Sequence, residues 1–144
     1  MSSNEVPGSH ELPADVRTLL FEHIESYEQL EILLLLQRNR GADWTAAQLS
    51  GHLKISDELV AESLSALQMG GLVLGRMELA PIAYAYAPAS LTLGETVSRL
   101  AAAYSERPVP IIRLMSSNAI QRVRTGAMRA LAESFVLGRG KNRG

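Results

Sequence analysis

The spacing of apolar positions along the chain predicts a mostly helical protein. From Val16 to Tyr27 apolar side chains recur every three or four residues, which is typical of one face of a helix. The following run, Leu30–Leu36, is apolar on nearly all sides, as expected of a central helix that packs against several neighbours. Two further helices are predicted over residues 46–53 and 56–69, the second with its apolar positions spaced by three and four.

The residue types at the ends of these segments support the boundaries. Thr45 and Ser56 are good N-terminal caps, and Gly70-Gly71 supplies the left-handed stop that often ends a helix. Beyond this stop, the alternation of residues predicts two short strands over 72–74 and 83–87, joined by a loop. We therefore expect a small β-hairpin after the fourth helix.

The C-terminal third has more apolar surface than one small core needs. Leu93, Val97, Leu100 and Tyr104 recur at intervals of four, three and four residues, the spacing of a coiled-coil seam. A second apolar face follows within residues 111–137, as one helix or as two divided near Ser116-Ser117-Asn118, and Gly126 further weakens the helical pattern. We predict that the chain is a homodimer through these helices, with the four-residue seam as the candidate contact.

The order helix, short strand, helix, turn, helix, hairpin over residues 30–87 resembles a winged helix-turn-helix. The run Ala66–Val73 looks like the end of a recognition helix entering its wing, and residues 21–31 and 100–109 resemble small bacterial winged-helix proteins with a C-terminal helical extension. The resemblance implies a mainly α fold with a small β-hairpin, and it places related domains among transcription regulators. The predicted organisation is a flexible lead-in (1–12), a winged-helix domain with an N-terminal helix (13–90), a dimerising helical extension (91–137) and a disordered basic tail (138–144).

Composition and charge narrow the function classes. The formal net charge of −1 hides a split, because residues 1–106 carry a net −8 and residues 107–144 a net +7. The absence of cysteine excludes disulfides, thiolate metal sites and a cysteine nucleophile. The longest apolar run, Ile32–Leu36, is far below the roughly 20 residues that a membrane span needs. With an N-terminus unlike a signal peptide, we expect a soluble cytoplasmic protein.

The helix in the recognition position is poorly suited to phosphate. Its predicted outer face carries Asp57, Glu58 and Glu62 and no base, whereas affinity for duplex DNA depends on Lys and Arg. These acids have three interpretations: helix capping on a solvated face, a surface that receives a basic partner protein, or direct acceptance from cytosine. In the second, the apolar loop residues Met77 and Leu79 complete the candidate partner face.

An alternative places nucleic-acid contacts elsewhere. The candidate residues are Lys54 in the turn, Arg76 in the wing, and Arg122 and Arg129, which are seven apart and share one side of a helix. For these arginines we favour a different interpretation, a solvated outer face or pairing with the acidic N-terminal helix of a second subunit.

No pattern for catalysis or metal binding is present. The three histidines, His10, His23 and His52, are scattered, and there is no phosphate-binding or nucleophile motif. We therefore expect no catalytic residue, no cofactor and no metal. The predicted function is a non-enzymatic, transcription-associated regulator that acts by protein contact. The alternative is a dimeric DNA-binding regulator, and a small-molecule sensor is a third option.

Overall fold

The computed structural model describes the backbone of residues 12–143 and the side chains of residues 12–136. The predicted lead-in, residues 1–12, lies outside the described residues except for its last position. Leu12 is only 7% exposed and belongs to the hydrophobic core. Assigning Leu12 to a loose lead-in was therefore wrong, and the folded body begins one residue earlier than predicted.

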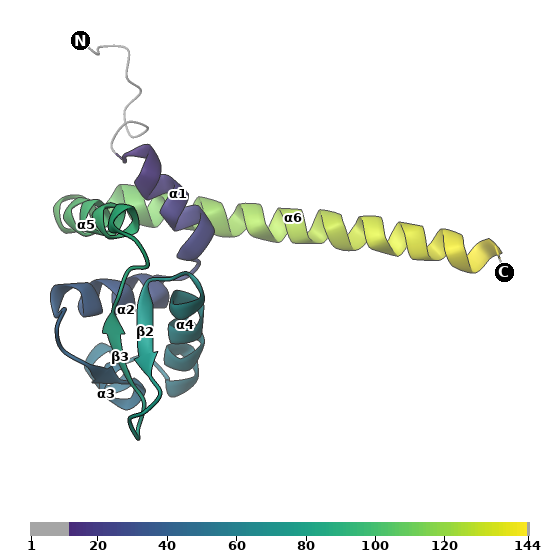
Figure 1. The fold of residues 1–144 in the computed structure, drawn as a ribbon. Coiled ribbons are helices and arrows are strands. Elements are labelled where there is room, and N and C mark those ends of the chain that lie inside the picture. Colours follow the sequence, from purple (N-terminus) through teal and green to yellow (C-terminus); the bar gives the residue numbers. More distant parts are fainter. Residues whose placement is uncertain (1–11, 144) are drawn as a thin grey trace, which may run out of the picture.

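The winged-helix body, residues 12–106, confirms the predicted fold class (Figure 1). Its sheet has three antiparallel strands in the order β1-β3-β2, so the two-residue strand β1 extends the predicted hairpin. The strand β3 lies between the other two, with Tyr84 opposite Trp44 on one side and Gly75 on the other. In chain order the first seven elements are α1 (Ala14–His23), α2 (Tyr27–Arg38), β1 (Trp44–Thr45), α3 (Ala46–Leu53), α4 (Asp57–Met69), β2 (Val73–Arg76) and β3 (Ala83–Tyr86).

Local capping fixes where α3 and α4 begin. Thr45 Oγ1 accepts a hydrogen bond from the Gln48 amide at 3.1 Å, and Gln48 Oε1 accepts from the Thr45 amide at 2.9 Å, which completes a capping box. Ser56 Oγ accepts from the Leu59 amide at 3.2 Å. After α4, Gly71 adopts a φ of +73°, a conformation that L side chains rarely adopt. Both predicted caps and the predicted stop are confirmed.

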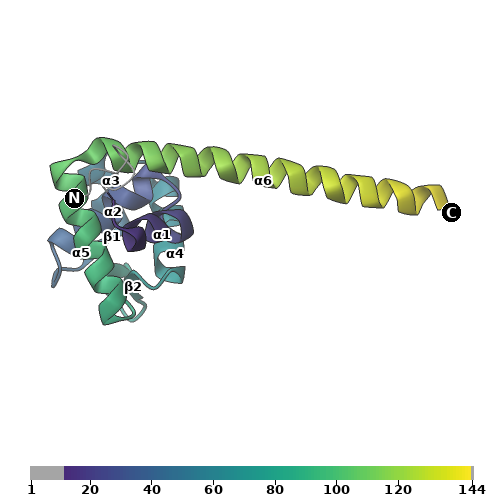
Figure 2. The same ribbon diagram turned by 90° about the horizontal axis from the view of Figure 1, so that it is seen from above.

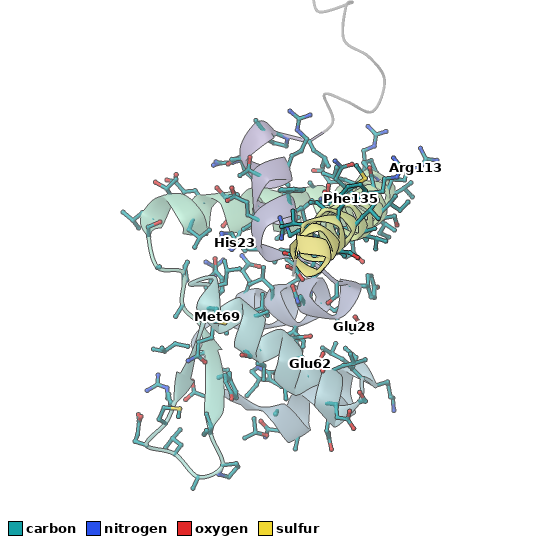
Figure 3. The ribbon with its side chains drawn as sticks, turned by 90° about the vertical axis from the view of Figure 1, so that its right-hand side faces the viewer. His23, Glu28, Glu62, Met69, Arg113 and Phe135 are labelled. Atoms are coloured by element: carbon teal, nitrogen blue, oxygen red, sulfur yellow. The ribbon has the colours of Figure 1, made fainter. Side chains whose placement is uncertain are left out.

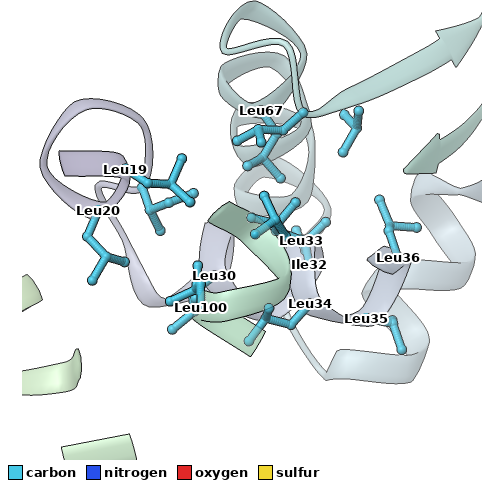
Figure 4. Packing of buried hydrophobic residues seen from close by; sticks show 14 of the residues in the cluster. Leu19, Leu20, Leu30, Ile32, Leu33, Leu34, Leu35, Leu36, Leu67 and Leu100 are labelled. Atoms are coloured by element: carbon cyan, nitrogen blue, oxygen red, sulfur yellow. The ribbon is translucent and has the colours of Figure 1, made fainter. Parts of the chain in front are cut away.

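The core is centred on α2, whose leucines face neighbours on all sides (Figure 4). Leu30 and Leu33 are fully buried, and Leu36 is 1% exposed. The helix α4 packs against α2 through its predicted apolar face, Val60, Leu64 and Leu67. Because this face is buried, the opposite side of α4 is held toward solvent.

The predicted coiled-coil seam lies inside the chain itself. The helix α5 (Leu91–Glu106) packs against α1 and α6, and Val97 and Leu100 on it are fully buried in the core. Leu93 and Tyr104 are half-buried and pack on the same core. Val97 and Leu100 are already covered within one subunit, so for these two residues the predicted contact with a second copy was wrong.

The helix α6 (Pro108–Arg143) is a single helix of 36 residues, about 54 Å long at 1.5 Å per residue. Its first part packs on α1 and α5, and the remainder extends far beyond the body (Figures 1 and 2). Neither Ser116-Ser117-Asn118 nor Gly126 interrupts it, so the alternative of two helices is excluded. The backbone of the predicted disordered tail is also helical as far as Arg143.

Candidate interaction surface

The solvent face of α4 is the acidic surface that the sequence predicts. Asp57, Glu58 and Glu62 are all exposed, and the 13 residues of α4 include no base. Asp57 and Glu58 lie in the first turn, where they interact favourably with the helix dipole. No ion pair is recorded for these three acids within the part of the chain that the structure describes. The acids are thus free to meet a charge from outside.

A groove of about 300 Å³ lies between α4 and the wing, which is the hairpin of β2 and β3 with its connecting loop. Met69 at the end of α4 is 87% exposed, and Met77 in the loop between β2 and β3 is 72% exposed. Unbranched methionine side chains adapt to partners of different shape. We call this hollow the α4–wing groove; its lining residues are Ala46, Ala61, Leu64, Ser65, Gln68, Met69, Met77, Ile82 and Tyr84.

The structure thus brings part of the predicted partner face together. Met77 lines the α4–wing groove, while Leu79, 41% exposed, lies in the wing loop but does not line it. Figure 3 shows Glu62 and Met69 on the same side of the body, below the end of α6. The lining combines apolar side chains with Ser65, Gln68 and Tyr84, and the three acids lie elsewhere on α4, outside the lining.

The wing is held in place by contacts with β1, which flanks β3 on the side away from β2. Trp44 on β1 pairs with Tyr84 across the sheet, and its ring packs edge-on against His52 with the centroids 5.4 Å apart. Burial raises the pKa of the Tyr86 hydroxyl, which is partly offset by the charge of Arg40. These aromatic residues support the hairpin and place Tyr84 at the edge of the groove.

Of the four predicted nucleic-acid contacts, two have partners within the chain and two are exposed. Arg76 Nε forms an ion pair with Asp43 at 3.1 Å, so the wing offers no free base. Arg122 Nη2 donates to the carbonyl of Phe21 at 2.6 Å, and its guanidinium lies 5.6 Å from the centre of the Phe21 ring. Arg122 therefore caps the last turn of α1, where carbonyls lack helical partners. Lys54 and Arg129 remain exposed.

Two polar clusters join the N-terminal helices to α5. Asp15 accepts hydrogen bonds from Arg99 Nε at 2.8 Å and from Thr96 Oγ1 at 3.0 Å. The Arg99 hydrogen bond holds the pKa of the Asp15 carboxyl below its usual value. The Tyr104 hydroxyl donates to Glu31 at 3.1 Å, and burial, with the neighbouring Tyr27 and Glu31, raises its pKa. Both clusters act as structural ties, because each joins helices distant in sequence.

Sequence reasoning missed a second hollow, of about 200 Å³, at the corner between α1 and α2. We call it the α6 groove; it is lined by Glu25, Tyr27, Ile112, Met115, Ser116 and Ala119. The exposed apolar positions of α6 were a signal for such a surface, but nothing in the sequence showed that Tyr27 would lie opposite them.

Other functional classes find no support in the described part of the chain. Among residues 12–136, no three His, Asp or Glu side chains come together to hold a metal ion. No described helix combines the length and the apolar character that crossing a membrane would require.

Comparison with proteins of known structure gives distant similarities. Reduced HlyU from Vibrio cholerae is 22% identical over 62% of this chain and 88% of its own, with a TM-score of 0.49. Wild-type ZitR of Lactococcus lactis in complex with DNA is 21% identical over 75% of this chain and 73% of its own, with a TM-score of 0.43. No protein-family model and no curated protein matches the sequence.

Proposed function

We propose that this protein is a non-enzymatic winged-helix regulator, associated with transcription, that acts in the cytoplasm by binding another protein. One observation carries the proposal: the helix in the recognition position exposes Asp57, Glu58 and Glu62 and no base, and the same helix lines the α4–wing groove. The bound segment presents an apolar side chain to Met77 and positive charge to the acids.

The alternative function, reading of duplex DNA, has less support. Of its four candidate contacts, Arg76 and Arg122 already have partners within the chain. Lys54 follows α3 and Arg129 lies on the extended part of α6, so the two exposed cations lie on different elements, neither of which is the recognition-position helix. Three acids on α4 would repel phosphates from the face that enters the major groove in most helix-turn-helix proteins.

A salt-titrated binding assay with labelled duplex DNA tests this choice. We expect no binding even at low salt, where the attraction of cations to phosphate is strongest. Binding that falls steeply with salt and is lost in the double variant Lys54→Ala with Arg129→Ala would contradict protein contact as the main function and favour the DNA-binding alternative.

A capture experiment tests the groove itself. The immobilised protein is exposed to an extract of its host, and bound proteins are compared between variants. We expect a protein that is retained by the wild type but lost with Glu62→Lys and with Met77→Asp. Glu95→Lys is the matched control, because Glu95 is an exposed acid on α5, outside the groove. Equal retention by all four proteins would rule out the α4–wing groove as the binding surface.

We further propose that the protein is a homodimer. The support is the extended part of α6, where Val123 is 72% and Leu131 64% exposed. Exposed apolar side chains that are spread along one extended helix are typical of an interface. Light scattering at micromolar concentration should give twice the mass of one chain, and a monomer there would contradict the proposal.

A further inference from the structure

The distal half of α6, residues 123–143, extends away from the described body of the chain. Its described side chains, residues 123–136, are all exposed, including Val123 and Met128. An isolated helix of this length is marginal in water, and most helices in proteins are stabilised by packing of an apolar face. The distal half therefore requires a partner for at least one side.

One side of α6 continues directly into the α6 groove. At 100° per residue, Val123 and Ala130 lie on the same side of the helix as Ile112 and Ser116, which line that groove. Met128 lies about 140° away from Val123 around the helix, on the opposite side. The face that needs covering and the groove that offers apolar contact thus form one continuous surface.

The α6 groove has acidic residues and the distal half of α6 has basic ones, so their charges are complementary. Beside the groove, Glu25 and Glu28 extend from the corner between α1 and α2, and neither has a recorded ion pair among the described residues. Figure 3, which looks along α6 from its C-terminal end, shows Glu28 beneath the helix. The described distal half carries Arg124 and Arg129 against one acid, Glu133.

We propose that the occupant of the α6 groove is the distal half of α6 from a second copy, with the two helices antiparallel and Val123 at the two-fold axis. A two-fold dimer uses the same patch on both subunits, so each groove receives the other copy's helix. This arrangement rests on the proposed homodimer and specifies its contact.

The antiparallel register sets a specific ion pair. With Val123 at the axis, position 129 of one copy lies six residues past the axis and is level with position 117 of the other. That level falls between Ser116 and Ala119, which line the groove together with Glu25. Arg129 points from the helix toward the same side as Arg122, which contacts the body. Arg129 of the second copy therefore meets Glu25.

The first test uses matched substitutions measured by light scattering and sedimentation. Val123→Glu places two carboxylates at the axis, and we expect the dissociation constant of the dimer to rise by about 100-fold. Met128→Glu is the control, because Met128 is similarly exposed, at 69% against 72%, but faces away. It should leave the dissociation constant unchanged.

The second test uses the absence of cysteine in the natural chain. In Val123→Cys, the two new thiols lie at the axis, and a short bifunctional thiol reagent should link most of the protein into covalent dimers. Met128→Cys, treated in the same way, should remain uncrosslinked. Both measurements are made on the full chain.

The third test exchanges the charges of the proposed ion pair. Glu25→Arg alone and Arg129→Glu alone should each weaken the dimer, by roughly tenfold for the two symmetric contacts of exposed charges. The double variant should recover the wild-type dissociation constant. If the dimer of the double variant is weakened by as much as the two single variants combined, the Glu25–Arg129 contact is overturned.

The outcomes separate this contact from the homodimer itself. A wild-type protein that stays monomeric overturns both proposals. A wild-type dimer that tolerates Val123→Glu and does not crosslink through Val123→Cys overturns the antiparallel docking of α6, while the homodimer proposal stands. Neither outcome affects the α4–wing groove, which lies on other elements.

Discussion

The winged-helix body and the distal half of α6 use the same residue types in opposite ways. In the body, leucines such as Leu30 and Leu33 are fully buried, whereas Leu131 on the distal half is 64% exposed. The first 106 residues carry a net −8 and the remainder a net +7. The difference shows that apolar content alone does not locate a core, because burial depends on which elements the chain folds back upon.

Core substitution should give the largest contrast between the two regions. Leu33→Ala removes a fully buried side chain and should lower the free energy of unfolding by about 2–5 kcal/mol. Met128→Ala, at a position 69% exposed, should change it by less than about 0.5 kcal/mol. Urea unfolding followed by circular dichroism at one protein concentration measures both. Comparable losses would mean that the distal half is part of the cooperative core.

The contrast between a packed and an exposed region also applies within α6, whose first part packs on the body and whose remainder does not. Arg122→Ala removes the cap on the Leu20 and Phe21 carbonyls and should lower the free energy of unfolding by about 1–2 kcal/mol. The matched variant is Arg124→Ala, two residues further along, where the side chain is exposed and forms no ion pair with another described residue. It should cost less than about 0.5 kcal/mol. Thermal unfolding of the two variants side by side tests where the anchored part of the helix ends.

The tie between α1 and α5 should depend on pH. Because Arg99 lowers the folded-state pKa of Asp15 below its usual 3.8, the ionised carboxylate stabilises the fold above that value. The contribution is lost as the pH falls through the lowered pKa. Asp15→Asn should cost about 0.5–1 kcal/mol at pH 7, a modest value because the carboxylate is partly exposed.

The difference in the free energy of unfolding between the wild type and Asp15→Asn should therefore disappear at low pH. Unfolding curves recorded from pH 7 down to pH 2 measure it, with Glu62→Gln as the control acid without a recorded partner. A difference that stays constant over this range would show that the Asp15 charge does not contribute to stability.

The most local effect is expected in the middle of the distal half. Nothing lies within 4 Å of a side chain added at Gly126, so Gly126→Ala should favour the helix by up to about 1 kcal/mol locally. Hydrogen exchange should slow for amides of the distal half and stay unchanged in α2. Slower exchange in both regions would show that the two are coupled.

Sequence reasoning succeeded where structure depends on neighbours in the chain. The caps at Thr45 and Ser56 bond to amides three residues away, and the stop at Gly71 depends on its own backbone angles. The acidic face of α4 followed from helical periodicity, since burying Leu64 and Leu67 turns Glu62 outward. Each of these predictions needed only a local rule.

The failures concern contacts between distant segments. The spacing of Val97 and Leu100 correctly indicated a buried stripe, but periodicity does not tell whether the covering helix belongs to the same chain. Arg122 looked like a free cation, although its acceptor, the carbonyl of Phe21, lies 101 residues earlier. The lining of the α4–wing groove was predicted only in part, because Met77 of the wing was named and Met69 of α4 was not.

The single tryptophan gives the molecule a built-in optical reporter. Trp44 contacts the ring of His52 and pairs with Tyr84, a residue that lines the α4–wing groove. Its buried indole Nε1 finds no hydrogen-bond partner among the residues that the structure describes. A segment that enters the groove and displaces Tyr84 would change the surroundings of this indole. The emission wavelength and quenching of the native fluorescence therefore report occupancy of the groove without any label.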